Sequence, residues 1–307
     1  AFARGGVAIL GGLGCDALSF GSETGDLELL HQLAALREDE PEALSRCIRE
    51  KLEAGMSHAR ARGEAVAEWL GLSSDAVNQP NLILAAEYLR AIEAGGYGMR
   101  SVIVRRMGDY HGDALGPFAS ATAIRAAFRR GEMEVALSAI PEPTRLFATP
   151  EALHPMDDLL LHILRGMTLE QLAALPDVSE GLEHRILDAC RVSATREELL
   201  EALKCKRYTR ARLSRALAHA LLGVDRAFTE AHPAPSYARL LGARKGAEPL
   251  LAELCARAEI PVVTRATELR GDPIFELECR ATDTWALLHD APEKRKAGRE
   301  FTEKFVR

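Results

Sequence analysis

Aromatic residues are scarce in this sequence and make up only 5% of its 307 residues. Aromatic and β-branched residues are enriched in strands, whereas leucine and alanine, which are abundant here, favour helices. The composition therefore argues against an all-β sandwich and favours a fold with many helices. Long apolar runs are missing as well, so we expect no segment to span a membrane.

Paired cysteines are also absent. The six cysteines are scattered along the chain, with no Cys-x-x-Cys pair and no close histidine partner. This pattern predicts reduced thiols in a cytoplasmic protein and argues against a disulfide framework or a zinc site. The nine histidines show no metal-ligand spacing either, so we expect no metal site built from protein side chains. Nothing in the sequence indicates a stable protein partner.

An excess of positive charge is missing too, because the net charge is −6. This balance argues against an indiscriminate nucleic-acid binder but leaves room for a local basic patch, since the distribution of charge sets the field. Apolar residues make up 47% and charged residues 27%, which is typical of a soluble globular protein. The length favours two domains.

The first 131 residues alternate between helical and strand patterns. The expected helices cover Phe2–Leu13, Leu27–Glu38, residues 41–70 with a break at Gly55, and a segment that starts at Pro80. The expected strands, both short and buried, cover Cys15–Phe20 and Ser101–Val104. Because helices and strands alternate, we predict an α/β domain with a parallel sheet over residues 1–131.

From residue 132 onward the pattern changes to one that is mainly helical, and we predict a second domain over residues 132–307. Five segments have apolar residues at helical spacing: Met156–Arg165, Leu169–Leu175, Gly181–Cys190, Glu197–Leu203 and Thr209–Leu222. We expect a small α/β element at about residues 235–290, with a helix over Gly246–Arg257, and a charged helical tail over Pro292–Arg307.

The helix expected after residue 119 starts with a pattern typical of phosphate binding. Ser120 stands at the helix start, Thr122 follows two positions later, and Arg125 lies one turn further on. The free N–H groups of a first helical turn attract anions, hydroxyls donate hydrogen bonds, and arginine adds a charged fork. The alternative is that Ser120 only caps the helix and that Arg125 is solvated.

Several segments, in order over nearly the whole chain, together resemble one family. They are Phe20–Asp26, Pro80–Asn81, Arg106–His111, Ser120–Arg125, Ser179–Ile186, Lys206–Thr209, Tyr237–Gly242 and Ala281–Asp283. These segments are similar to those of the bacterial tRNA(Met) cytidine acetate ligases, which are related to the HxGH nucleotidyltransferases. The order and spacing of these segments together are specific to this family.

The sequence departs from the family at one point, because the family's Asn-Pro-Phe-His-x-Gly-His motif has no counterpart in it. Either that segment belongs to a longer polypeptide, or the protein has lost it. The motif would supply half of the phosphate clamp. We therefore expect that residues 1–307 alone do not catalyse adenylation and that the ligase activity belongs to a longer polypeptide.

The resemblance implies a partial Rossmann-like nucleotidyltransferase domain followed by a mainly helical domain. It implies an enzyme that uses ATP, with Mg²⁺, to activate acetate as acetyl-adenylate and to acetylate N4 of the wobble cytidine in elongator tRNA(Met). The implied ATP-binding residues are Gly21, Asn81, Arg106, Ser120, Thr122 and Arg125. Gly21 would let the backbone approach the nucleotide, although it could equally be a plain turn glycine. Asn81 offers both a donor and an acceptor, and could also cap a helix.

The densest basic run of the chain lies between residues 204 and 215. We predict that Lys204, Lys206, Arg207 and Arg210 contact the phosphates of tRNA, with Tyr208 available for stacking. The alternative is an ordinary solvated face. Two other functions stay open: a nucleotidyltransferase that acts on a small phosphorylated substrate, and a non-catalytic RNA-binding homologue. The long helical region argues against the first of these.

Overall fold

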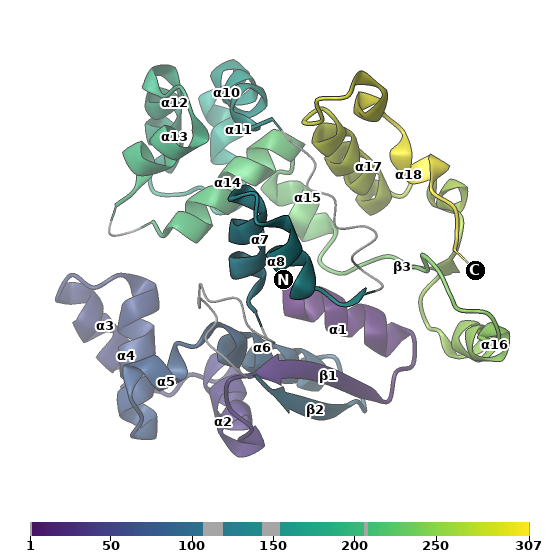
Figure 1. Ribbon diagram of the computed structural model, residues 1–307. Helices are drawn as coiled ribbons and strands as arrows, with labels where there is room; N and C mark the ends of the chain where they lie inside the picture. The colour runs from purple at the N-terminus through teal and green to yellow at the C-terminus, as the bar shows by residue number, and fades with distance from the viewer. Residues whose placement is uncertain (1, 107–118, 143–153, 206–207, 307) are drawn as a thin grey trace.

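The computed structural model describes residues 2–106, 119–142, 154–205 and 208–306, and it combines a small parallel sheet with many helices (Figure 1). The predicted α/β fold class is thereby confirmed. The sheet and its helices form the lower part of the molecule in Figure 1, and the helices of the middle of the chain form the upper part. Among the described residues, no helix combines the length and the apolar character that crossing a membrane requires.

The first part of the chain alternates helices and strands as predicted. Its elements are α1 (Phe2–Gly12), β1 (Ala17–Ser22), α2 (Leu27–Glu38), α3 (Glu42–Glu53), α4 (His58–Leu70), α5 (Ser74–Val77), α6 (Pro80–Ala94) and β2 (Arg100–Arg105). The break between α3 and α4 falls at Gly55, whose φ of +88° suits glycine. Strands β1 and β2 pair in parallel with Gly21 opposite Val104, so their carboxyl ends meet at one edge.

The expectation of two fully buried strands is wrong, because each strand buries only one face. Leu18 and Phe20 of β1 belong to the core, and the Phe20 ring lies 5.5 Å from that of Tyr88 on α6. On the opposite face, Val102 is 39% and Val104 56% exposed. Helix α6 packs against one side of the pair, and none of the described elements buries the side chain of Val104. The carboxyl edge of the sheet is therefore open on that face.

The middle of the chain is helical. Helices α7 (Ala121–Arg129) and α8 (Met133–Ser138) pack on each other, and α10 (Asp157–Gly166), α11 (Leu169–Ala173), α12 (Leu182–Val192), α13 (Arg196–Leu203) and α14 (Arg210–Leu222) share a hydrophobic core, followed by α15 (Arg226–Ala231). All five predicted helical segments are present within a few residues of their expected bounds. Leu164, Leu172 and Leu199, none of which is exposed, lie in a cluster separate from the core of the sheet.

The last part of the chain contains a small β–α–β unit. Its elements are β3 (Ala238–Arg239), α16 (Glu248–Arg257), β4 (Val262–Val263), η1 (Ala266–Leu269), α17 (Pro273–Ala286), η2 (Pro292–Arg295) and α18 (Arg299–Thr302). Strands β3 and β4 are parallel. The expected helical tail is mostly wrong, since only η2 and α18 are helical. Gly298, with φ +83°, starts α18, and Val306 pairs with Gly242 in a bridge that needs an extended chain end.

Backbone and side-chain bonds join this last part to both of the others. The N–H of Glu259 donates to the carbonyl of Gly12 at the end of α1 (2.6 Å), and Arg257 pairs with Asp16 (3.3 Å). On the other side, Arg280 of α17 donates to the carbonyl of Leu222 at the end of α14 (2.7 Å). The division at residue 131 stays a prediction.

Candidate nucleotide site and basic surface

Two of the predicted ATP-binding residues, Gly21 and Arg106, meet at the carboxyl edge of the sheet. The N–H of Arg106 donates to the carbonyl of Ser22 (2.9 Å), which extends the strand pairing by one residue. A Cβ built on Gly21 would lie 3.4 Å from Cγ of Arg106, an ordinary contact. The protein itself therefore does not demand glycine here. What glycine does provide is an exposed backbone without a side chain, at the strand edge where α/β sheets bind ligands.

Asn81 lies at the same edge, held by a carboxylate that sequence analysis did not single out. Its Nδ2 donates to Oε1 of Glu23 (2.7 Å), and its backbone N–H donates to the same oxygen (3.3 Å). The interpretation of Asn81 as a helix cap is wrong, because Gln79 occupies the cap position and Asn81 is the second residue of α6. Glu23 ties the turn after β1 to the start of α6.

Glu23 has a further property that points to a ligand. Its Oε2 is buried, and no hydrogen-bond partner reaches it from the described residues. A buried acceptor without a partner costs free energy, so such groups are commonly satisfied by water or a ligand. The sequence offered one hint, since Glu23 follows β1 directly within the turn that ends at Asp26.

The other three predicted ATP-binding residues lie together at the start of α7. Ser120 is the N-cap, and its Oγ accepts from the N–H of Ala123 (3.0 Å), so the predicted cap is confirmed. Thr122 and Arg125 are exposed, and within the described residues the guanidinium of Arg125 makes no hydrogen bond or ion pair. Residues 107–118, which join β2 to this helix and include His111, lie outside the described residues. The six predicted residues thus form two groups, and their joint use of one nucleotide stays a prediction.

The two predicted tRNA-binding residues that the structure describes, Lys204 and Arg210, both pair with neighbouring acids. Lys204 pairs with Glu201 (3.3 Å), and Arg210 pairs with both Glu201 (3.4 Å) and Glu197. Hydrogen bonding between Arg210 and Glu197 raises the pKa of the arginine and lowers that of the glutamate. Exposed pairs of this kind stabilise a protein very little, so RNA can compete for the cations, but their field is weakened. Lys206 and Arg207 lie outside the described residues.

Tyr208 does not offer its ring for stacking on RNA, contrary to expectation. The residue is only 3% exposed, its hydroxyl donates to the carbonyl of Ser179 (3.1 Å), and the guanidinium of Arg212 lies 4.9 Å from the ring centroid. Arg215 is likewise engaged, by Asp177 (2.9 Å). These side chains connect α14 to the turn before α12, which is a structural role.

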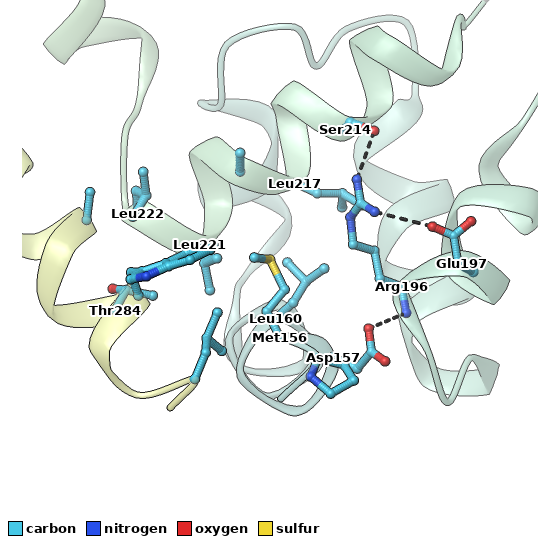
Figure 2. Close-up of a pocket in the computed structure, with 15 residues that line it drawn as sticks. Met156, Asp157, Leu160, Arg196, Glu197, Ser214, Leu217, Leu221, Leu222 and Thr284 are labelled. Carbon is cyan, nitrogen blue, oxygen red and sulfur yellow. Dashed lines mark hydrogen bonds and ion pairs between the residues drawn. The ribbon is translucent and has the colours of Figure 1, made fainter. Parts of the chain in front are cut away.

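A pocket of about 690 Å³ lies between the helical region and α17 (Figure 2). Its walls are mostly apolar and include Leu160, Leu217 and the half-exposed Trp285. At its polar end, the guanidinium of Arg196 donates to Ser214 (3.2 Å) and Glu197 (3.3 Å), as the dashed lines in Figure 2 show. The pocket shares no residue with the predicted ATP site.

Known proteins similar to this chain place it in a family. The model of the HIGH Nucleotidyl Transferase family matches residues 1–300. The chain belongs to this family. Among relatives, the tRNA(Met) cytidine acetate ligase of Syntrophomonas wolfei is 31% identical over 98% of this chain and 79% of that protein. The ligases of Syntrophotalea carbinolica and Bacillus subtilis are 34% and 33% identical, over 94% and 95% of this chain and 75% and 74% of their own lengths.

Solved structures agree with the sequence relatives. Thermotoga maritima TmcAL without ligand superimposes with a TM-score of 0.88 at 25% identity, over 99% of this chain and 80% of that chain. The same protein bound with alpha-thio ATP gives a TM-score of 0.85 at 27% identity, over 100% and 80% of the two chains. This nucleotidyl transferase chain therefore has the fold of a family member that has been solved with an ATP analogue.

Proposed function

We propose that this HIGH nucleotidyl transferase is an ATP-dependent ligase that modifies tRNA. It activates acetate as acetyl-adenylate and transfers the acetyl group to N4 of the wobble cytidine of elongator tRNA(Met). The observation that carries the proposal is the match over nearly the whole chain to proteins named tRNA(Met) cytidine acetate ligase. The close fold agreement with Thermotoga maritima TmcAL bound with alpha-thio ATP supports the use of ATP.

The geometry of the strand edge suits one end of a nucleotide. The exposed backbone at Gly21 allows close approach, Asn81 keeps its side-chain carbonyl as an acceptor, and Oε2 of Glu23 can accept from a hydroxyl group. Arg106 supplies a cation beside Gly21. We assign Gly21, Glu23 and Asn81 of this edge to the nucleoside part of ATP, and Arg106 to its charged end.

The start of α7 suits the phosphates. Thr122 offers a hydroxyl and Arg125 an exposed guanidinium near the beginning of a nine-residue helix, where N–H groups favour anions. Ser120 holds the first turn in shape through its bond to Ala123. We assign Ser120, Thr122 and Arg125 to the triphosphate.

The proposed chemistry needs charge neutralisation and positioning more than acid–base groups. A carboxylate oxygen of acetate attacks the α-phosphorus and pyrophosphate departs; then N4 of the cytidine attacks the acetyl carbonyl, AMP departs, and N4 loses a proton. In this proposal, Arg106 and Arg125 bind the anionic groups. Mg²⁺ would neutralise phosphate charge. No three acidic, histidine or cysteine side chains converge within the described residues, so Mg²⁺ would be held mainly by phosphate oxygens and water.

The direct test uses protein expressed from its complete reading frame, with labelled acetate, ATP and a transcript of elongator tRNA(Met). We expect label in N4-acetylcytidine at the wobble position only when acetate, ATP and tRNA are all present. A transcript with uridine at the wobble position is the matched control. Pyrophosphate exchange that depends on a small phosphorylated substrate instead of acetate would favour the nucleotidyltransferase alternative. Binding of tRNA without any exchange would favour the non-catalytic RNA-binding alternative.

The basic run gives a separate prediction. Replacing Lys206, Arg207 and Arg210 together by alanine should flatten the salt dependence of tRNA binding by about 0.7–0.9 in log–log slope for each phosphate that is no longer neutralised. ATP affinity, measured by calorimetry, should not change. If the triple substitution leaves the tRNA affinity unchanged at every salt concentration, the run is a solvated face.

A further inference from the structure

A cleft of about 580 Å³ in the C-terminal β–α–β unit has the chemistry of a nucleic-acid contact. Its lining residues come from the loop before α16, from α16 itself, from the segment after β4 and from the chain end. They include Arg244, Lys245, Glu248, Leu251, Arg265 and Phe305. None of these residues belongs to the candidate ATP site.

The cleft is built by tertiary pairing at the carboxyl edge of two parallel strands. The N–H of Ala243 donates to the carbonyl of Val306 (2.9 Å), and the N–H of Val306 donates to the carbonyl of Leu241 (3.0 Å). These two bonds fix Phe305, which is partly exposed, beside the loop after β3. Because the wall is formed by paired backbone, its shape is defined before any ligand binds.

Two cations of this cleft are available, unlike Lys204 and Arg210 of the predicted basic run. Arg244 and Lys245 are exposed, and their side chains make no ion pair or hydrogen bond within the described residues. Arg265 pairs with Glu268 (2.8 Å) through Nε but keeps 78% of its side chain exposed. Glu248 is the one acidic residue among the described lining residues, so positive charge prevails there.

We propose that this cleft binds nucleotides of the tRNA, with Arg244 and Lys245 on backbone phosphates and Phe305 under an unstacked base. The inference rests on the proposed function, because it takes tRNA as the substrate. Cations that follow a backbone beside an aromatic ring are the common means of binding single-stranded or looped RNA. Leu251 adds an apolar floor to the same cleft.

The charge part of the inference is tested with the double variant R244A/K245A. The variant lacks two phosphate-binding cations, and each lost phosphate contact lowers the log–log slope of tRNA affinity against salt concentration by about 0.7 for single-stranded RNA. The slope should therefore be smaller by about 1.4. The control R4A/R49A removes two exposed cations that also lack partners within the described residues but lie on α1 and α3. It should leave the slope within error. Equal changes in both double variants would overturn the assignment in favour of diffuse attraction.

The stacking part is tested at Phe305. Phe305→Leu should weaken tRNA binding by at least about fivefold, because a base can no longer stack on an aromatic ring, whereas Phe305→Tyr keeps the ring and should keep the affinity. Thermal unfolding of both variants shows whether the chain end stays in place. If Phe305→Leu binds tRNA as well as the unchanged protein does, the stacking role is wrong.

Binding measurements with AMP distinguish a site for RNA from a site for a free nucleotide, because both ligands carry a phosphate and a base. AMP should not displace tRNA from the cleft, even at AMP concentrations high enough to saturate a single weak phosphate contact. The R244A/K245A substitution should not change the affinity for AMP. If AMP binding falls with that variant as steeply as tRNA binding does, the cleft is a small-molecule site and the inference is overturned. If the unchanged protein acetylates tRNA while all cleft variants bind it normally, only the cleft assignment fails. If it neither binds nor acetylates tRNA, the proposed function fails with it.

Discussion

Replacing Arg125 by alanine is expected to weaken ATP binding by roughly ten- to a hundredfold. The guanidinium lies exposed near the start of α7 and makes no hydrogen bond or ion pair within the described residues, so its donors are free for phosphate oxygens. Removing a hydrogen bond to a charged group costs about 1.5–3 kcal/mol, which corresponds to that change in affinity. Isothermal calorimetry with ATP measures it.

Arg129 provides the matched control for this experiment. It lies one turn further along the same helix, is exposed, and likewise has no partner within the described residues. Arg129→Ala removes the same charge from the same helix and should change ATP affinity by less than about twofold, because exposed charges are screened. Equal effects at both positions would mean that α7 attracts ATP only through its overall charge. No effect at Arg125 would remove this residue from the phosphate site.

Replacing Glu23 by alanine is expected to weaken ATP binding by roughly five- to a hundredfold. Two N–H donors of Asn81 lose their common acceptor, the turn after β1 separates from the start of α6, and the buried acceptor Oε2 disappears. Removing hydrogen bonds of buried groups costs about 1–3 kcal/mol. Glu23→Gln can keep the bond to Asn81 but replaces one acceptor by a donor. Its ATP affinity should therefore lie between that of the unchanged protein and that of Glu23→Ala.

Part of the Glu23 effect could come from a looser fold, and a second variant separates the two causes. Thr195 caps α13, a helix of the separate helical core, because its Oγ1 accepts from the N–H of Glu198 (3.1 Å). Thr195→Ala removes this cap. Removing a cap costs about 1 kcal/mol of stability, so urea unfolding should show a decrease, with no change in ATP affinity. If Thr195→Ala weakens ATP binding as much as Glu23→Ala does, the effect reflects stability and Glu23 has no direct role.

Local patterns predicted most of the helices. The bounds of α2 coincide with the predicted segment, because Asp26 caps its start through Leu29 and its apolar residues recur on one face. The break at Gly55 was predictable from glycine itself. The tail after Pro292 was not, since its charged residues favour a helix locally while Val306 pairs with a distant loop. Long-range strand pairing leaves no local pattern.

The candidate site was predictable in part for the same reason. Gly21 and Ser120 stand at positions where a strand ends and a helix begins, so their neighbours in sequence identify them. The bond between Glu23 and Asn81 joins residues 58 positions apart, and no periodicity indicates it. The pattern of charge along the chain also could not show that Arg210 faces Glu197, which lies on another helix.

The sequence by itself determined the fold class, the order of the elements and the family, because these depend on spacing along the chain and on the similarity of segments in order. Tertiary structure alone decided which polar groups are satisfied. It paired Lys204 and Arg210 with acids, buried Tyr208, and left the side chains of Arg244 and Lys245 around a cleft without partners among the described residues. The physical reason is that the charge and hydrogen-bonding capacity of a residue are set by its type, whereas its partners are set by elements that meet only when the chain folds.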